Sequence, residues 1–159
     1  MNFAFKTFLI RDWQPGDRQG AAAVIGQVLK EYGLGWEPDG ADQDVVQVED
    51  HYRDGEFWVV ERDGAIVGTA AYHPIERGEQ AVEIRKMYLL PVARGQGLGR
   101  CLLSQLELAI AARGFKEIWL ETATVLKEAV RMYESAGYVM ATDVETVRCD
   151  RAYKKRINP

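Results

Sequence analysis

The stretch "PVARGQGLGRCLLSQL", residues 91–106, decides how the rest of the chain is interpreted. Glycine stands at every second position, at Gly95, Gly97 and Gly99, between Arg94 and Arg100. An amphipathic helical pattern follows at once. Glycine costs backbone entropy on folding and adds no side chain to the packing, so this density indicates close approach of a ligand to the backbone.

The glycines stand just before the predicted start of a helix, where main-chain N–H groups lack helical partners and the helix dipole is positive. A strand, a glycine loop and a helix N-terminus together form a common phosphate-binding arrangement. The spacing differs from G-x-G-x-x-G and from G-x-x-x-x-G-K-[ST], which excludes both common nucleotide loops. The pattern that remains is Arg94-x-x-Gly97-x-Gly99. The same spacing, with the hairpin-rich first half, disfavours a Rossmann-type dehydrogenase.

Length and composition predict one domain over residues 1–159, since 47% hydrophobic and 28% charged residues are ordinary values for a globular chain. No apolar run approaches the roughly 20 residues that span a bilayer. The start, "MNFAFKTFLIRDWQ", is typical of a strand rather than a signal peptide. Cys101 and Cys149 lack metal-type spacing. We therefore expect a cytoplasmic protein with no membrane partner and no metal.

The charge distribution argues against nucleic acid as a partner, because the net charge is -4. Positive charge is nevertheless concentrated between residues 81 and 100. This stretch contains one acid, Glu83, and four basic residues: Arg85, Lys86, Arg94 and Arg100. A basic patch beside a glycine loop indicates a small anionic ligand.

Hydrophobic periodicity predicts a mixed α/β sheet with helices packed on it. The Asp63-Gly64 pair predicts a tight hairpin, and the unit around the glycine loop predicts a right-handed β-α-β crossover. Strands are expected over residues 5–11, 56–62, 65–73, 81–90, 116–122, 137–140 and 146–157. Helices are expected over residues 15–33, within 41–53, from 97 to 114 and over 124–135, with Val125, Ala129, Met132 and Tyr133 on one stripe of the last.

This order of elements, with the loop, resembles the GCN5-related N-acetyltransferase (GNAT) superfamily over nearly the whole chain. The segment "TFLIRDWQPGD" is similar to its first strand and helix start, and "EFWVVERDGAIVGTAAY" to its second and third strands. "EIRKMYLLPVARGQGLGRCLL" is similar to its fourth strand, loop and third helix. "EAVRMYESAGY" is similar to its fourth helix, with Ala129, Tyr133, Gly137 and Tyr138 in the recurring positions. The resemblance implies a largely antiparallel sheet with a central β-α-β unit, splayed fourth and fifth strands, and acetyl-CoA as cosubstrate.

The resemblance also implies which residues hold acetyl-CoA. The pantetheine arm is expected along the backbone of Met87, Tyr88 and Leu89, as an added strand, with an N–H near Leu89 stabilising the oxyanion. The pyrophosphate is expected on the backbone amides of Arg94, Gly95, Gln96, Gly97, Leu98, Gly99 and Arg100. Many relatives carry Asn where this chain has Leu126, so one cofactor contact is expected to be missing.

Two side chains are the catalytic candidates. Tyr133 occupies the superfamily's usual acid position, although its place on an apolar stripe also fits a core residue. Glu83 is the expected base, directly or through water, with a salt bridge to Arg85 as the alternative. Strand alternation predicts that Glu83, Arg85 and Met87 share one face. Glu121 is the second candidate for the base.

The expected reaction is direct attack of a primary amine on acetyl-CoA, the amine being a small molecule, an amino acid or a peptide. Arg85 and Lys86 favour an amine that also carries a carboxylate. An acidic set favours a polyamine or protein lysine, although a solvated helix face is the preferred interpretation of it: Asp39, Asp42, Asp44, Glu49 and Asp50. The alternative function is a non-catalytic acyl-CoA-binding module. Dimers are common among relatives, so a homodimer is a further expectation.

Overall fold

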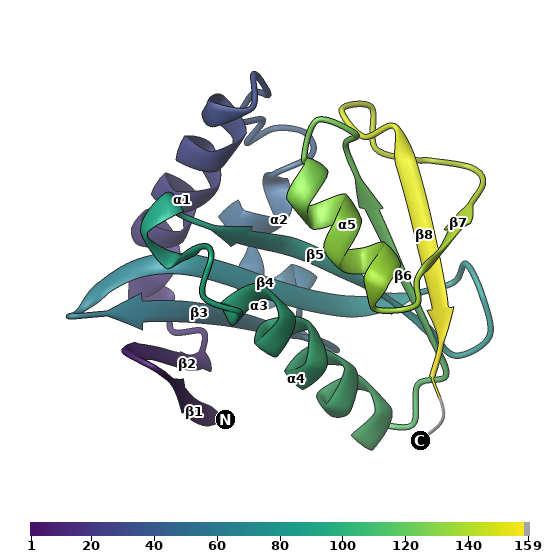
Figure 1. Cartoon of the computed structure of the whole chain (residues 1–159), viewed down its shortest axis with the longest axis horizontal. Helices are drawn as coiled ribbons and strands as arrows, with labels where there is room; N and C mark the ends of the chain where they lie inside the picture. The colour runs from purple at the N-terminus through teal and green to yellow at the C-terminus, as the bar shows by residue number, and fades with distance from the viewer. Residues whose placement is uncertain (158–159) are drawn as a thin grey trace.

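The computed structural model describes residues 1–157, built around one eight-stranded sheet in the order β1-β2-β3-β4-β5-β6-β8-β7 (Figure 1). All neighbouring strands pair antiparallel except β5 and β6, which are parallel and joined through α4. This confirms the largely antiparallel sheet with a central β-α-β unit. The strands are β1 (Asn2–Phe5), β2 (Phe8–Asp12), β3 (Glu56–Arg62), β4 (Ala65–Ile75), β5 (Ala81–Leu89), β6 (Glu117–Thr122), β7 (Val139–Ala141) and β8 (Arg151–Arg156). That the chain is a single domain over residues 1–159 stays a prediction.

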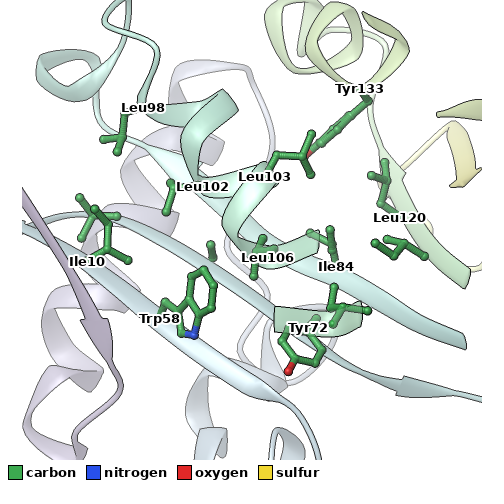
Figure 2. Close-up of a cluster of buried hydrophobic side chains, with 14 of the residues drawn as sticks. Ile10, Trp58, Tyr72, Ile84, Leu98, Leu102, Leu103, Leu106, Leu120 and Tyr133 are labelled. Carbon is green, nitrogen blue, oxygen red and sulfur yellow. The ribbon is translucent and has the colours of Figure 1, made fainter. Parts of the chain in front are cut away.

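Helices cover both faces of the sheet, α4 and α5 on one face and α1, α2 and α3 on the other (Figure 1). Alternate strand residues therefore serve different cores: Trp58 packs beneath α4 while Val59 packs beneath α1 and α3. Figure 2 shows the larger core on the α4 side, where Leu102 and Leu106 contact the sheet. The helices are α1 (Arg18–Glu31), α2 (Gln43–Val46), α3 (Val48–His51), α4 (Leu98–Ala112) and α5 (Lys127–Ser135), with 3-10 turns η1 (Pro15–Asp17) and η2 (Pro91–Ala93).

The sequence predicted the β3/β4 hairpin but not the β1/β2 hairpin. Asp63 and Gly64 both have positive φ, 53° and 80°, and join β3 to β4 as predicted. The single strand expected over residues 5–11 is instead the β1/β2 hairpin, whose turn places Lys6 at φ 52°. Lysine has no preference for left-handed backbone, so composition did not mark this turn.

Three boundaries also differ from prediction. The helix expected within 41–53 divides into α2 and α3, because Gln47 adopts φ -128° and ψ 48° between them. Val125 lies before α5 begins and is 50% exposed, and Val130 is buried on that helix instead. The last strand begins at Arg151, since residues 146–150 form turns and irregular backbone.

A bulge in β5 corrects the predicted facing of its side chains. The register with β4 shifts between Thr69 and Ala71, and Lys86 has φ 53°. An inserted residue reverses the alternation beyond it. Met87 consequently packs with the core on the α4 face, so the prediction that it shares a face with Glu83 and Arg85 is wrong.

The expected splay between the two parallel strands is confirmed. Pairing between β5 and β6 stops at Ile84 and Leu120, although β5 continues to Leu89 and β6 to Thr122. Beyond that point the strands diverge. The candidate functional site is built around this divergence.

Candidate functional site

The glycine loop presents free main-chain donors at the start of α4. Gly95 and Gly97 have φ of 74° and 85°, and Gly97 is the N-cap of α4. Within residues 1–157, the N–H groups of residues 95–100 make no hydrogen bond, whereas Arg94 and Cys101 on either side donate to Pro91 and Gly97. The loop thus leaves a row of neighbouring main-chain donors free at the start of α4, as an anion site requires.

Side chains of the loop hold it in this shape. The guanidinium of Arg94 donates to both carboxylate oxygens of Glu31, at 2.6 and 2.9 Å, and to the carbonyl of Leu89 at 2.9 Å. The hydrogen bond from Arg94, outweighing a small burial effect, lowers the pKa of Glu31. Lys6 donates to the Gln96 carbonyl at 2.8 Å. The Arg94 side chain is therefore occupied by the protein itself.

A cleft of about 330 Å³, which we call the loop cleft, lies between this loop, the end of β5 and α5. Every predicted cofactor-binding residue lines it except Gln96, whose side chain donates to Val92 instead. Sequence reasoning missed Arg131 on α5, which lines the cleft together with Arg100. Both side chains are exposed and form no ion pair within the described residues. Only its position two residues before Tyr133 could have signalled Arg131.

A smaller cavity of about 50 Å³, the strand gap, occupies the space between the diverging ends of β5 and β6. Tyr133 lines both the loop cleft and the strand gap and is 5% exposed. Its hydroxyl makes no hydrogen bond to any described residue, and burial raises its pKa, with Tyr88 and Cys149 adding to the effect. Figure 2 shows the ring at the margin of the large core. The residue is thus both a core side chain and part of the site.

Cys149 is a second group in the strand gap, one that the sequence reasoning had considered only as a metal ligand. Burial, reinforced by Glu121, raises the pKa of its thiol to about 11. The thiol is therefore protonated near neutral pH, which makes it a poor nucleophile.

The two candidate bases have different surroundings. Glu83 is 9% exposed and lies 3.6 Å from both His73 and Arg85, so the predicted salt bridge to Arg85 is present. Glu121 accepts from Arg77 at 2.9 Å and from the N–H groups of Glu145 and Thr146. Those donors outweigh burial and lower the pKa of Glu121. Glu121 holds the 142–147 loop, while Glu83 has no hydrogen-bonded partner among the described residues.

A third cavity, of about 400 Å³, opens on the other side of the strand gap and is called the outer cavity below. Two of the acids predicted to be solvated are buried here: Asp42, which is bound to the lining residue Arg148, is fully buried, and Asp44, which lines the cavity, is 4% exposed. Lys86 lies 3.1 and 3.2 Å from their carboxylates. The solvated interpretation is wrong for this pair because partners distant in sequence bury them. The other three acids are exposed: Asp39, Glu49 and Asp50.

Among residues 1–157, no three His, Cys, Asp or Glu side chains are placed to hold a metal ion. In the same part of the chain, no helix has the length and apolar character to cross a membrane.

The sequence matches known proteins over most of its length. Residues 24–138 match the model of the acetyltransferase (GNAT) family. An uncharacterized N-acetyltransferase of Escherichia coli strain K12, YjgM, is 34% identical over 142 residues, which cover 86% of this chain and 85% of the relative.

Solved structures share the fold. A GNAT-family acetyltransferase of Staphylococcus aureus Mu50 superposes with a TM-score of 0.88 at 17% identity, covering 95% of this chain and 99% of its own. The acetyltransferase YncA of Salmonella typhimurium, solved with its cofactor acetyl-CoA, gives 0.72 at 17% identity, covering 96% and 95%. The family match spans the loop, the splayed strands and Tyr133. The chain therefore belongs to the GNAT family of acetyltransferases.

Proposed function

We propose that this acetyltransferase moves the acetyl group of acetyl-CoA to a primary amine by direct attack of the amine on the thioester. One observation carries the proposal: the cleft beneath the free N–H groups continues into the strand gap, and Tyr133 lines both. A diphosphate on the loop would thus lead a thioester to the divergence of the two strands.

The residues of the loop cleft fit acetyl-CoA. The N–H groups of residues 95–100 suit the pyrophosphate, and Arg100 and Arg131 add positive charge at the cleft. Leu90 donates its N–H to Val67, so by antiparallel alternation the N–H of Leu89 points away from β4. That N–H is available to the pantetheine arm or to the thioester oxygen. YncA, with the same fold, was solved with acetyl-CoA.

The proposed acid is Tyr133. When the amine has attacked, the carbonyl oxygen carries charge, which the N–H of Leu89 stabilises, and the departing thiolate needs a proton. Because burial raises the pKa of Tyr133, its hydroxyl is protonated at neutral pH and can donate. The hydroxyl has no competing hydrogen bond among the described residues.

The proposed base is Glu83, acting through water. Glu83 lines none of the three cavities, but its neighbour Arg85 lines both the strand gap and the outer cavity. One water would bridge the carboxylate to an amine beside Arg85. Glu121 is less suited, because its oxygens already accept from Arg77 and two N–H groups.

A route through a covalent acetyl-enzyme is disfavoured, because the thiol that lines the strand gap, that of Cys149, is a poor nucleophile. The thiol of Cys149 has a pKa of about 11, so little thiolate exists at neutral pH. Direct transfer needs no such intermediate.

The test measures release of the CoA thiol from acetyl-CoA with a panel of primary amines, and binding of acetyl-CoA by calorimetry. Binding together with amine-dependent thiol release supports the proposal. Binding without release for any amine points to the alternative, a non-catalytic acyl-CoA-binding module. Absence of binding contradicts both.

A further inference from the structure

The route of the acceptor is defined by the residues that neighbouring cavities share. Arg85 and Arg148 line both the strand gap and the outer cavity, and no other described residue does. If the outer cavity receives the acceptor, its nitrogen must pass these two guanidinium groups to reach the gap.

The two arginines differ in how many donors remain free. Arg148 makes two hydrogen bonds of 2.6 Å to Asp42, one of 3.0 Å to the carbonyl of Gly35 and one of 3.5 Å to Glu37. Arg85 makes one, from Nη2 to the carbonyl of Ala41 at 3.1 Å. A guanidinium has five N–H donors, so Arg85 keeps most of them.

The carboxylates near Arg85 do not use its remaining donors. Glu83 and Asp44 lie 3.6 and 3.8 Å from it, beyond hydrogen-bond distance. Asp44 instead accepts from the hydroxyl of Tyr52 and lies 3.2 Å from Lys86. The two acids at the rim, Glu37 and Glu145, lie 3.5 Å from Arg148 and 3.7 Å from Arg77.

We propose that the acceptor is a free α-amino acid, whose carboxylate binds the guanidinium of Arg85 while its amino nitrogen enters the strand gap. This inference rests on the proposed acetyl transfer. A carboxylate fits an arginine through paired, charge-assisted hydrogen bonds. Because Arg85 borders the gap itself, the carboxylate must lie close to the attacking nitrogen, as it does across one carbon in an α-amino acid.

The same placement helps the chemistry. An ammonium group beside guanidinium groups loses its proton more readily, because like charges disfavour the charged form. The carboxylate offsets the repulsion that a simple amine would meet at the two arginines. Peptide N-termini and polyamines lack that neighbouring carboxylate.

The first test compares matched acceptors on the wild-type enzyme. For each side chain, the α-amino acid, its carboxamide and its decarboxylated amine are assayed for thiol release from acetyl-CoA. We expect kcat/KM to be at least about tenfold higher for the acid, the size of a charged hydrogen bond. Equal or higher values for the amide or amine overturn the inference and leave the acetyl transfer standing.

The second test assigns the preference to Arg85. Arg85→Gln should raise KM for amino acids about tenfold or more and bring the acid-to-amide ratio of kcat/KM close to one, whereas Arg85→Lys should retain part of the preference. Arg113→Gln, which removes hydrogen bonds to Tyr72 and Asp54 away from the three cavities, is the matched control and should match the wild type.

Each outcome separates the two proposals. A full acid preference in a folded Arg85→Gln enzyme that binds acetyl-CoA normally overturns the assignment. If Arg85→Gln does not fold, the wild-type acid-to-amide ratio and Arg85→Lys decide. If acetyl-CoA binds but no member of the panel releases thiol, the proposed acetyl transfer is wrong, and the inference about the acceptor is wrong as well.

Discussion

Tyr133 is buried where the loop cleft meets the strand gap, with a hydroxyl that no described residue engages. Tyr133→Phe should lower kcat by about 10²-fold or more, the usual contribution of a positioned proton donor. Acetyl-CoA affinity should change little because the ring remains. Thiol-release kinetics and calorimetry measure the two effects. Unchanged turnover would remove Tyr133 from the mechanism.

The two candidate bases, Glu83 and Glu121, lead to different predictions. Glu83→Gln should lower kcat/KM by about 10²-fold, with smaller losses at higher pH, where more of the amine is already neutral. Glu121→Gln should weaken the hold on the N–H groups of Glu145 and Thr146, and so raise KM for the acceptor more than it lowers kcat. Steady-state kinetics across a pH series distinguishes them. The reverse pattern would make Glu121 the base.

At the scale of single residues, the sequence predicts the features that depend on a local pattern of residue types. The loop glycines were singled out by their spacing, and Tyr133 by the resemblance of its segment to the fourth helix of the GNAT family. The bulge at Lys86 was not predicted, because its φ is 53° and lysine is not a residue type that indicates left-handed backbone. The bulge reversed the face of the sheet on which Met87 lies. The burial of Asp42 depends on Arg148, which lies over a hundred positions further along the chain.

At the scale of elements, the glycine loop and the first turn of α4 form one structural unit, since Gly97 of the loop is the N-cap of the helix. Gly97 has φ 85°, where a β-branched residue is strained by about 1–2 kcal/mol. Gly97→Val should therefore reshape the loop and raise the Kd for acetyl-CoA by at least about tenfold. Calorimetry measures the change.

The matched control lies in α1. A Cβ added at Gly26 meets nothing within 4 Å, and its φ is not positive. Gly26→Ala should stabilise that helix by about 0.5–1 kcal/mol and leave acetyl-CoA affinity unchanged. Wild-type affinity in Gly97→Val would contradict the assignment of the loop.

Elements with strong periodicity or turn chemistry were predicted well, α4 and the β3/β4 hairpin above all. Elements held by tertiary contacts were not. The helix expected within 41–53 breaks at Gln47, where the chain brings Asp42 and Asp44 beneath the sheet to meet Lys86. Those charges come from two segments that are distant in the sequence, and no local window of sequence contains the reason for the break.

Across the whole molecule, one buried ion cluster joins the α2 segment, the β5 bulge and the 148–150 segment beside the site. Asp42 is fully buried, accepts two hydrogen bonds from Arg148 and one from the N–H of Glu37, and lies 3.1 Å from Lys86. Burial alone would raise its pKa, but Arg148 and Lys86 outweigh burial and lower it. The cluster therefore stabilises the fold only while the carboxylate is charged.

The sign of the pH dependence follows. A carboxylate whose pKa is lower folded than unfolded contributes full stability above its unfolded pKa of about 3.9, and loses it as the pH falls through the folded value. Asp42→Asn should cost about 3–5 kcal/mol near neutral pH, because it leaves buried cations without their partner. The exposed ion-pair variant Asp50→Asn should cost at most about 1 kcal/mol. Urea unfolding over a pH series measures both, and the deficit of Asp42→Asn should shrink below about pH 4 as the wild-type carboxylate is protonated. A deficit that stays constant into acid would mean that Asp42 stabilises the site by packing rather than by charge.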